Sequence, residues 1–157
     1  MILEKAMAKL NINYVGINGG TMGEAFRTMT GKPTIRYSSK DLSDDQLWDI
    51  IKDGDKRRFP MGAGTRVSNH GLVAGHAYGI LDAKQLTDAD GNVVHKLIKM
   101  RNPWGSERYT GDWSDKSSLW TPEFKKQVDF VDSNDGIFYV PFQQWRSDWA
   151  DFNVCHY

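Results

Sequence analysis

Two side chains in this sequence have types and spacing that suit acid–base chemistry. His76 lies in the segment 73–82, which is rich in Val, Ile and Tyr, and Asn102 directly follows a second such segment, 93–101. Histidine changes charge near neutral pH and is the commonest general base in enzymes. The carbonyl oxygen of an asparagine can hold the second ring nitrogen and fix the tautomer without adding charge. The pair therefore predicts a general base with an orienting amide.

A hairpin would bring these two residues together. The segment Asp88–Asn92 separates the two apolar runs, and its Asp-Gly step is a strong signal for a β-hairpin turn. Residues that face each other across a hairpin have numbers that average to the turn centre, and those of His76 and Asn102 average to 89. We expect the pair at the open end of the hairpin. On spacing alone, a strand histidine with an arbitrary neighbour remains the alternative.

The residues beside each member fit a catalytic role. Gly75 leaves room for a substrate main chain next to His76, and Pro103 favours an extended conformation at Asn102. Trp104 could cover a hydrogen bond between the histidine and the asparagine and exclude competing water. Together with a cysteine, this pair would form the Cys-His-Asn triad of thiol proteases.

The remaining pattern predicts a single α+β domain over residues 1–157. Short N-terminal helices come first, and a twisted antiparallel sheet follows them. Helical spacing and capping signals predict helices over 2–10, 21–31 and 43–54, the last with a Ser43–Gln46 capping box. Strands are predicted over 73–82, 93–101, 136–141 and 150–156.

Composition excludes several classes of partner. The chain has 39% hydrophobic and 25% charged residues, and its formal net charge is zero. No general electrostatic attraction to nucleic acid or to an anionic membrane surface is expected. No apolar run is long enough to span a bilayer. Cys155 is the single cysteine and cannot form an internal disulfide, so we expect an intracellular, cytoplasmic protein.

Several motifs, taken in order, resemble the calpain family of cysteine proteases. Gly75-His76-Ala77-Tyr78 and the later Arg101-Asn102-Pro103-Trp104-Gly105 resemble its histidine and asparagine motifs. The opening 3–10, the segments 110–115 and 135–138, and shorter matches between residues 19 and 31 resemble flanking parts of the same half of the protease core. The resemblance thus runs along nearly the whole chain.

The resemblance implies a fold and a reaction. The chain would be the second, histidine- and asparagine-bearing half of a papain-like protease core, with a barrel-like sheet and without the cysteine-bearing half. His76 would be the catalytic base, Asn102 its orienting partner, and Gly75 and Trp104 supporting residues of a peptide-bond hydrolase. No segment matches the family's cysteine motif, and Cys155 is expected to be a packed core thiol. The isolated chain is therefore expected to be inactive until the cysteine-bearing half joins it.

Calcium is a further implication of the resemblance. The family binds one calcium ion in this half, and Asp115 and Asp135 match two of its acidic positions. Arg108 and Ile137 stand where the family usually has glutamates, although Glu107 is adjacent. Calcium prefers six to eight oxygen ligands, so we expect a weakened or missing site, with a displaced one through Glu107 as the alternative. No other cofactor is expected.

Two alternatives to the protease interpretation remain at this stage. A catalytically silent calpain-like module would keep the fold and serve a binding or regulatory role. An unrelated recognition domain would use the aromatic residues, which are concentrated in the second half of the chain, to bind peptide or carbohydrate. A Cys-Trp motif preceding residue 1 in the parent would favour the enzyme over the silent form.

Overall fold

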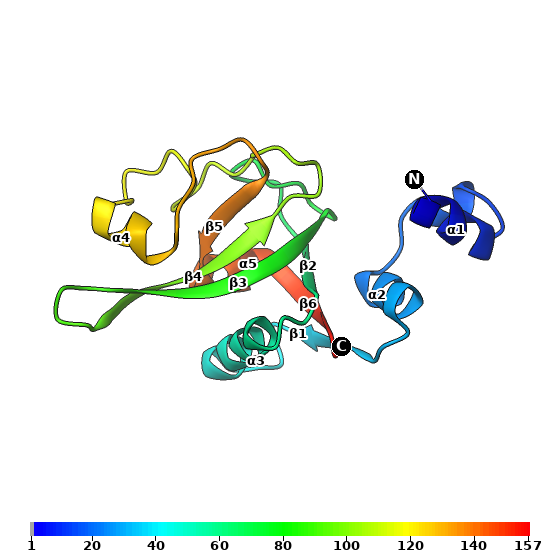
Figure 1. Ribbon diagram of the computed structural model, residues 1–157, viewed down its shortest axis with the longest axis horizontal. Helices are drawn as coiled ribbons and strands as arrows, with labels where there is room; N and C mark the ends of the chain where they lie inside the picture. The colour runs from blue at the N-terminus through cyan, green and yellow to red at the C-terminus, as the bar shows by residue number, and fades with distance from the viewer. Residues whose placement is uncertain (1) are drawn as a thin grey trace.

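The computed structural model describes residues 2–157, which form a six-stranded antiparallel sheet flanked by helices (Figure 1). The strand order across the sheet is β1-β6-β2-β3-β4-β5. The fold class is α+β, as predicted. In chain order the elements are α1 (Ile2–Leu10), the 3-10 helix η1 (Val15–Ile17), α2 (Met22–Thr30), β1 (Thr34–Ser38), α3 (Asp44–Lys56), β2 (Met61–Thr65), β3 (Ala77–Thr87), β4 (Val93–Arg101), α4 (Pro122–Gln127), β5 (Ile137–Pro141), α5 (Phe142–Asp148) and β6 (Trp149–Cys155).

The order of helices and strands differs from the prediction. Strand β1 lies between α2 and α3, and two helices, α4 and α5, stand among the later strands. The sheet therefore draws strands from both ends of the chain and does not simply follow the helices. Within residues 2–157, β1 and β5 are the edges of an open sheet and do not pair with each other.

The long hairpin of β3 and β4 forms the centre of the site-bearing half of the sheet. Gly79 pairs with Arg101, which centres the turn on residue 90 rather than 89. The register shifts at Leu81 and again near the turn, as expected for β-bulges. Strand β3 begins at Ala77, so the first four residues of the predicted strand 73–82 form a turn instead. The predicted hairpin is confirmed.

Strand β2 was not predicted from the sequence. Its segment Met-Gly-Ala-Gly-Thr has two glycines, which are poor strand formers. It becomes a strand because it pairs on both sides, with Gly62 opposite Gly79 on β3 and Ala63 opposite Phe152 on β6. A Cβ at Gly62 would lie 2.6 Å from the sulfur of Met22, so the missing side chain also lets α2 approach the sheet. Tertiary pairing outweighs local preference here.

Helix α3 begins where the sequence predicted and ends later. Ser43 accepts a hydrogen bond from the backbone N–H of Gln46, and the Gln46 side chain accepts one from the Ser43 N–H, which completes the capping box. The predicted stop at Gly54 lies inside the helix, which continues to Lys56. A Cβ at Gly54 would lie 2.5 Å from the Met61 sulfur. This glycine therefore serves close packing between α3 and β2.

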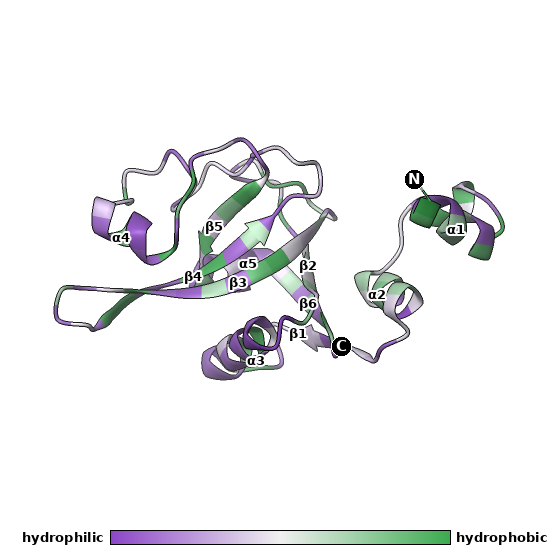
Figure 2. Cartoon of the chain, in the orientation of Figure 1, coloured by the Kyte–Doolittle hydropathy of each residue, from purple (hydrophilic) through white to green (hydrophobic). Residues whose placement is uncertain are grey.

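Two apolar clusters stabilise the sheet. The larger cluster joins α3 and α5 to the sheet and contains fully buried aromatic side chains, among them Trp145, Trp149 and Phe152. The smaller cluster lies beneath α4, where Trp113 and Trp120 pack against Tyr139 and Leu86. Figure 2 shows apolar stretches along β3, β4 and β5, which supply both clusters. Most aromatic residues of the second half are thus core residues.

The N-terminal arm, residues 2–20 with α1 and η1, packs differently. In Figure 1 α1 stands beyond α2, away from the sheet. Ala8 is the one buried residue of α1. Six large apolar side chains of the arm are exposed: Ile2, Leu3, Leu10, Ile12, Tyr14 and Val15. No helix within residues 2–157 has the length and apolar content needed to cross a bilayer.

Candidate active site

His76 is held by backbone contacts at the open end of the hairpin. It directly precedes β3, and Gly75 before it has a φ of +74°, a left-handed conformation that glycine adopts without strain. The His76 N–H donates to the Val73 carbonyl at 3.1 Å, and the His76 carbonyl accepts from the Thr65 N–H at 3.0 Å. These bonds fix the main chain on both sides of the imidazole. Apart from its two chain neighbours, no residue would lie within 4 Å of a Cβ at Gly75, so this glycine faces open space.

Asn102 is fixed where β4 ends. Its N–H donates to the Gly136 carbonyl at 2.8 Å, and its own carbonyl accepts from the Gly105 N–H at 3.0 Å. The residue is 1% exposed, so its side-chain amide needs partners within the protein. The sequence predicted a neighbour of His76 here, and the structure brings the two side chains into contact.

The two side chains share one hydrogen bond. His76 Nε2 lies 3.0 Å from Asn102 Oδ1. The Trp104 N–H also donates to Oδ1 at 3.1 Å, while Asn102 Nδ2 donates to the Ser106 carbonyl at 3.3 Å. Each end of the amide therefore has a partner of the matching type, which sets its orientation. Because Oδ1 is an acceptor, Nε2 must carry the proton, and in the neutral ring Nδ1 has a free lone pair.

Two aromatic rings enclose the imidazole. The Trp104 ring lies 4.3 Å from it between centroids, at an interplanar angle of 33°. Trp104 is itself 55% exposed, so it forms the outer cover of the pair. On the buried side, Tyr78 meets the imidazole edge-on at 4.7 Å. Sequence reasoning gave Tyr78 no role, although residues i and i+2 at the start of a strand share a face.

Cys155 lies away from this pair. It is fully buried at the end of β6, where Thr34 is its partner on β1 and its sulfur lies 3.3 Å from the Thr30 hydroxyl. The other end of β6, at Trp149, pairs with Thr65 of β2, which contacts His76. Six residues of strand span roughly 20 Å, so Cys155 is too remote to act with His76. The expectation of a packed core thiol agrees with this position.

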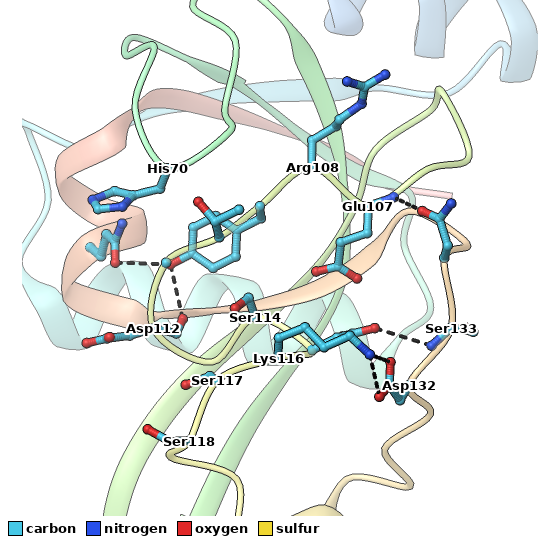
Figure 3. Close-up of a pocket in the computed structure, with 16 residues that line it drawn as sticks. His70, Glu107, Arg108, Asp112, Ser114, Lys116, Ser117, Ser118, Asp132 and Ser133 are labelled. Atoms are coloured by element: carbon cyan, nitrogen blue, oxygen red, sulfur yellow. Dashed lines mark hydrogen bonds and ion pairs between the residues drawn. The ribbon is translucent and has the colours of Figure 1, made fainter.

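Two of the three acidic residues singled out in the sequence, Glu107 and Asp115, line one pocket of about 800 Å³, whereas Asp135 is not among its lining residues. Glu107 points into this pocket, whereas the Arg108 side chain extends away from it (Figure 3). Burial, together with the neighbouring Asp115 carboxyl, raises the pKa of Glu107 to about 8. Burial also raises the pKa of Asp115. The cluster thus concentrates like charges in a partly buried place.

The carboxyl groups of this cluster fit a cation only in part. Both oxygens of Glu107 are buried, and their polar neighbours are the carboxyl group and the backbone of Asp115. Asp135 is engaged elsewhere, because its two oxygens accept from the Ser133 hydroxyl at 2.6 Å and the Ile137 N–H at 2.8 Å. Within residues 2–157 no three His, Cys, Asp or Glu side chains are arranged as metal ligands. Asp115 is also engaged in part, because its Oδ2 accepts a hydrogen bond from the Ser133 N–H at 3.3 Å.

A histidine whose tautomer is set by an asparagine amide, on an α+β scaffold, is the arrangement that cysteine proteases combine with a thiol. The family described as calpain family cysteine protease matches residues 1–156 of this sequence. The chain belongs to the calpain family.

Individual relatives support the assignment. The chain is 34% identical over 168 residues to the calpain-type cysteine protease ADL1 of Oryza sativa subsp. japonica. It is 34% identical over 166 residues to the calpain-1 catalytic subunit of Rattus norvegicus, and 35% identical over 167 residues to that of Bos taurus. These alignments cover 98–99% of this chain, but the chain spans only 8% of the rice protein and 23% of each calpain-1 subunit.

Proposed function

We propose that this chain is the histidine- and asparagine-bearing half of a calpain-type cysteine endopeptidase. The observation that carries the proposal is the 3.0 Å contact from His76 Nε2 to an Asn102 amide whose orientation is fixed by two further hydrogen bonds. That contact leaves Nδ1 as the basic nitrogen. Family membership supports the same assignment, and protein or peptide chains would be the substrates.

The chemistry follows from the free nitrogen. Nδ1 of His76 takes the proton of a cysteine thiol that another segment supplies, and the thiolate attacks the scissile carbonyl carbon. The imidazolium then protonates the leaving amine, and the acyl group stays on sulfur as a thioester. Next, Nδ1 accepts a proton from water, whose oxygen attacks the thioester. The imidazolium then returns this proton to the departing sulfur, so the acid and the thiol are released and the ring is neutral again. Asn102 keeps the imidazole ring oriented through all of these steps, and Trp104 shields the His76–Asn102 hydrogen bond from solvent.

A cysteine-bearing half is the proposed partner. Cys155 is buried at the far end of β6, and the N-terminal arm carries six exposed large apolar side chains. Exposed apolar surface of this extent is typical of an interface. The chain alone is then inactive, and catalysis requires that half, within the same parent. The single buried cysteine supports an intracellular setting for the parent.

The test is peptide cleavage by the parent protein that contains this chain. His76→Ala should lower kcat/KM by about 10⁴-fold, because removal of a triad member costs this order of magnitude. His95→Ala is the matched control, since His95 is exposed near the distal end of the same hairpin and packs on Trp113 at 4.9 Å. Equal and measurable cleavage by the two variants would refute the proposal. A parent that folds yet cleaves no peptide, with or without His76, would instead identify the catalytically silent module.

We also propose a weak calcium site at Glu107 and Asp115, with Asp135 as a third ligand if its side chain turns from Ser133. When bound, the cation would neutralise the clustered carboxylates and rigidify the loops that carry them. The buried Glu107 carboxyl group, which lies beside the Asp115 carboxyl group, supports this proposal. Millimolar calcium at pH 8 should raise the Tm of the chain, and Asp115→Asn should abolish the increase. An unchanged Tm would show that this family site is lost.

A further inference from the structure

The turn that carries the Asn102 amide is held by a segment more than thirty residues further along the chain. The Gly136 carbonyl accepts the Asn102 N–H at 2.8 Å at the start of the turn. At its other end, Asn134 Oδ1 accepts the Glu107 N–H at 2.7 Å. The two contacts fall on either side of Ser106, whose carbonyl receives Asn102 Nδ2 at 3.3 Å. The segment 134–136 thus holds both ends of the turn 102–107.

Gly136 allows this approach because it has no side chain. Its φ is +83°, a conformation that other residues rarely adopt. A Cβ here would lie 2.8 Å from the Asn102 carbonyl oxygen, 3.1 Å from the Ser106 nitrogen and 3.2 Å from the Gly105 Cα. All three atoms belong to the backbone, so no rotamer change can relieve the contact. An added methyl group would have to displace the turn itself.

Asn134 acts on the same turn through a different kind of contact. Asn134 is exposed, and its side-chain oxygen accepts the hydrogen bond that fixes the Glu107 N–H. Glu107 directly follows Ser106, so this bond sets where the Ser106 carbonyl stands. The Ser106 carbonyl in turn fixes the rotation of the Asn102 amide, and with it the acceptor that faces His76.

We propose that Gly136 and Asn134 are positioning residues for the Asn102 amide. They touch neither His76 nor the reacting atoms and act by fixing the turn 102–107. The effect on catalysis rests on the proposed protease function, whereas the effect on the His76–Asn102 bond does not. Misplacement of an orienting group by about 1 Å costs on the order of 100-fold in rate, which is the effect expected at Gly136.

The structural test uses the isolated chain and nitrogen-detected NMR of the imidazole. In the unchanged chain the Nε2 proton should exchange slowly, and the Nε2–H tautomer should dominate. Gly136→Ala should lose the slow proton and give mixed tautomers. Gly91→Ala is the matched control, because Gly91 has a φ of +85° and a Cβ there would meet nothing within 4 Å. A Gly136→Ala chain that keeps the slow proton and the single tautomer would overturn the proposal.

Asn134 variants keep the test decisive if Gly136→Ala fails to fold. Asn134→Ala removes the acceptor from an exposed position and should speed exchange of the Nε2 proton about fivefold, the value of one modest hydrogen bond. Asn134→Asp retains an acceptor oxygen and should restore slow exchange. Identical exchange in Asn134→Ala and the unchanged chain would contradict the role of this residue.

The same variants in the parent connect the turn to catalysis. Gly136→Ala should lower kcat about 100-fold with KM within about threefold, because the change affects orientation of the base rather than substrate binding. A KM increase with unchanged kcat would overturn the positioning role. If the NMR effects appear but no form of the parent cleaves peptide, the positioning of Asn102 stands and the protease function is the part that fails.

Discussion

The sheet body, residues 21–157, and the N-terminal arm satisfy their apolar residues in different ways. In the body most large aromatic side chains are buried in two clusters, with Trp145, Trp149 and Phe152 fully buried, although Trp104 and Tyr157 are exposed. In the arm the apolar side chains face outward, and a pocket of about 600 Å³ lies between the arm and α2. The body thus contains its own hydrophobic core. The arm carries apolar side chains of the kind found in a core, but no surface of residues 2–157 covers them. The His76–Asn102 site therefore lies in the region that has its own hydrophobic core.

The largest expected difference between the two regions concerns their core residues. Phe152→Ala in the body should lower the free energy of unfolding by about 3–5 kcal/mol, because Phe152 is fully buried and stacks on Tyr37 at 5.2 Å. Tyr14→Ala in the arm should change it by less than about 0.5 kcal/mol, since Tyr14 is 54% exposed. Urea unfolding of both variants measures the two values. Similar losses would mean that the arm belongs to the same core.

The next-largest expected effect is a dependence of the free energy of unfolding on pH, and it arises from a residue of the body. Glu107 has a pKa of about 8 in the folded chain, against 4.5 for a free side chain, because burial disfavours its charged form. The folded state therefore holds the proton more tightly than the unfolded state does, so stability should fall as pH rises from about 4.5 to about 8 and level off above. Glu107→Gln should remove this fall. Urea unfolding at several pH values, with the unchanged chain beside the variant, measures it.

A second carboxyl group makes the paired measurement necessary. Burial and the neighbouring Asp82 raise the pKa of Asp55 to about 6, which adds a loss of stability of the same sign between about pH 4 and pH 6. The difference between Glu107→Gln and the unchanged chain cancels this contribution. If the two curves run parallel between pH 6 and pH 8, the carboxyl group of Glu107 is not the cause.

The smallest expected effect is removal of the arm. Deletion of residues 2–20 should lower the free energy of unfolding of the body by less than about 1 kcal/mol, because segments with few buried contacts add little to global stability. Binding of a hydrophobic dye such as ANS should fall at the same time, since six exposed apolar side chains are removed. Chemical denaturation and dye fluorescence test the two parts separately. A large loss of stability would remove the distinction between arm and body.

Local chemistry made part of the fold and site predictable. The Asp-Gly turn between two apolar runs predicted the hairpin, and the hairpin placed His76 beside Asn102 despite a one-residue error in its centre. The Ser43 capping box predicted the start of α3 for the same reason, because its hydrogen bonds lie within four residues. The family resemblance predicted the calpain assignment over nearly the whole chain.

Features set by distant partners were not predictable in this way. Strand β2 exists because β3 and β6 pair with it, although its glycines disfavour a strand. Helix α5 directly follows β5 and has only seven residues, too few for a clear helical period in the sequence. Gly136 meets the Asn102 turn across 34 residues, and no local motif reports such a contact. Each of these depends on tertiary packing rather than on sequence spacing.

The two edge strands of the sheet affect whether copies of the chain can associate. Open sheets expose unpaired N–H and C=O groups at their outer strands, which can template pairing with another copy. Here both outer strands, β1 and β5, are only five residues long. Strand β1 carries the Arg36–Asp151 ion pair at its surface, and β5 ends at Pro141, which has no N–H to donate. Edge strands that are short and carry a charged pair or a terminal proline disfavour fibril-like growth. The chain should therefore not aggregate at the concentrations that NMR requires.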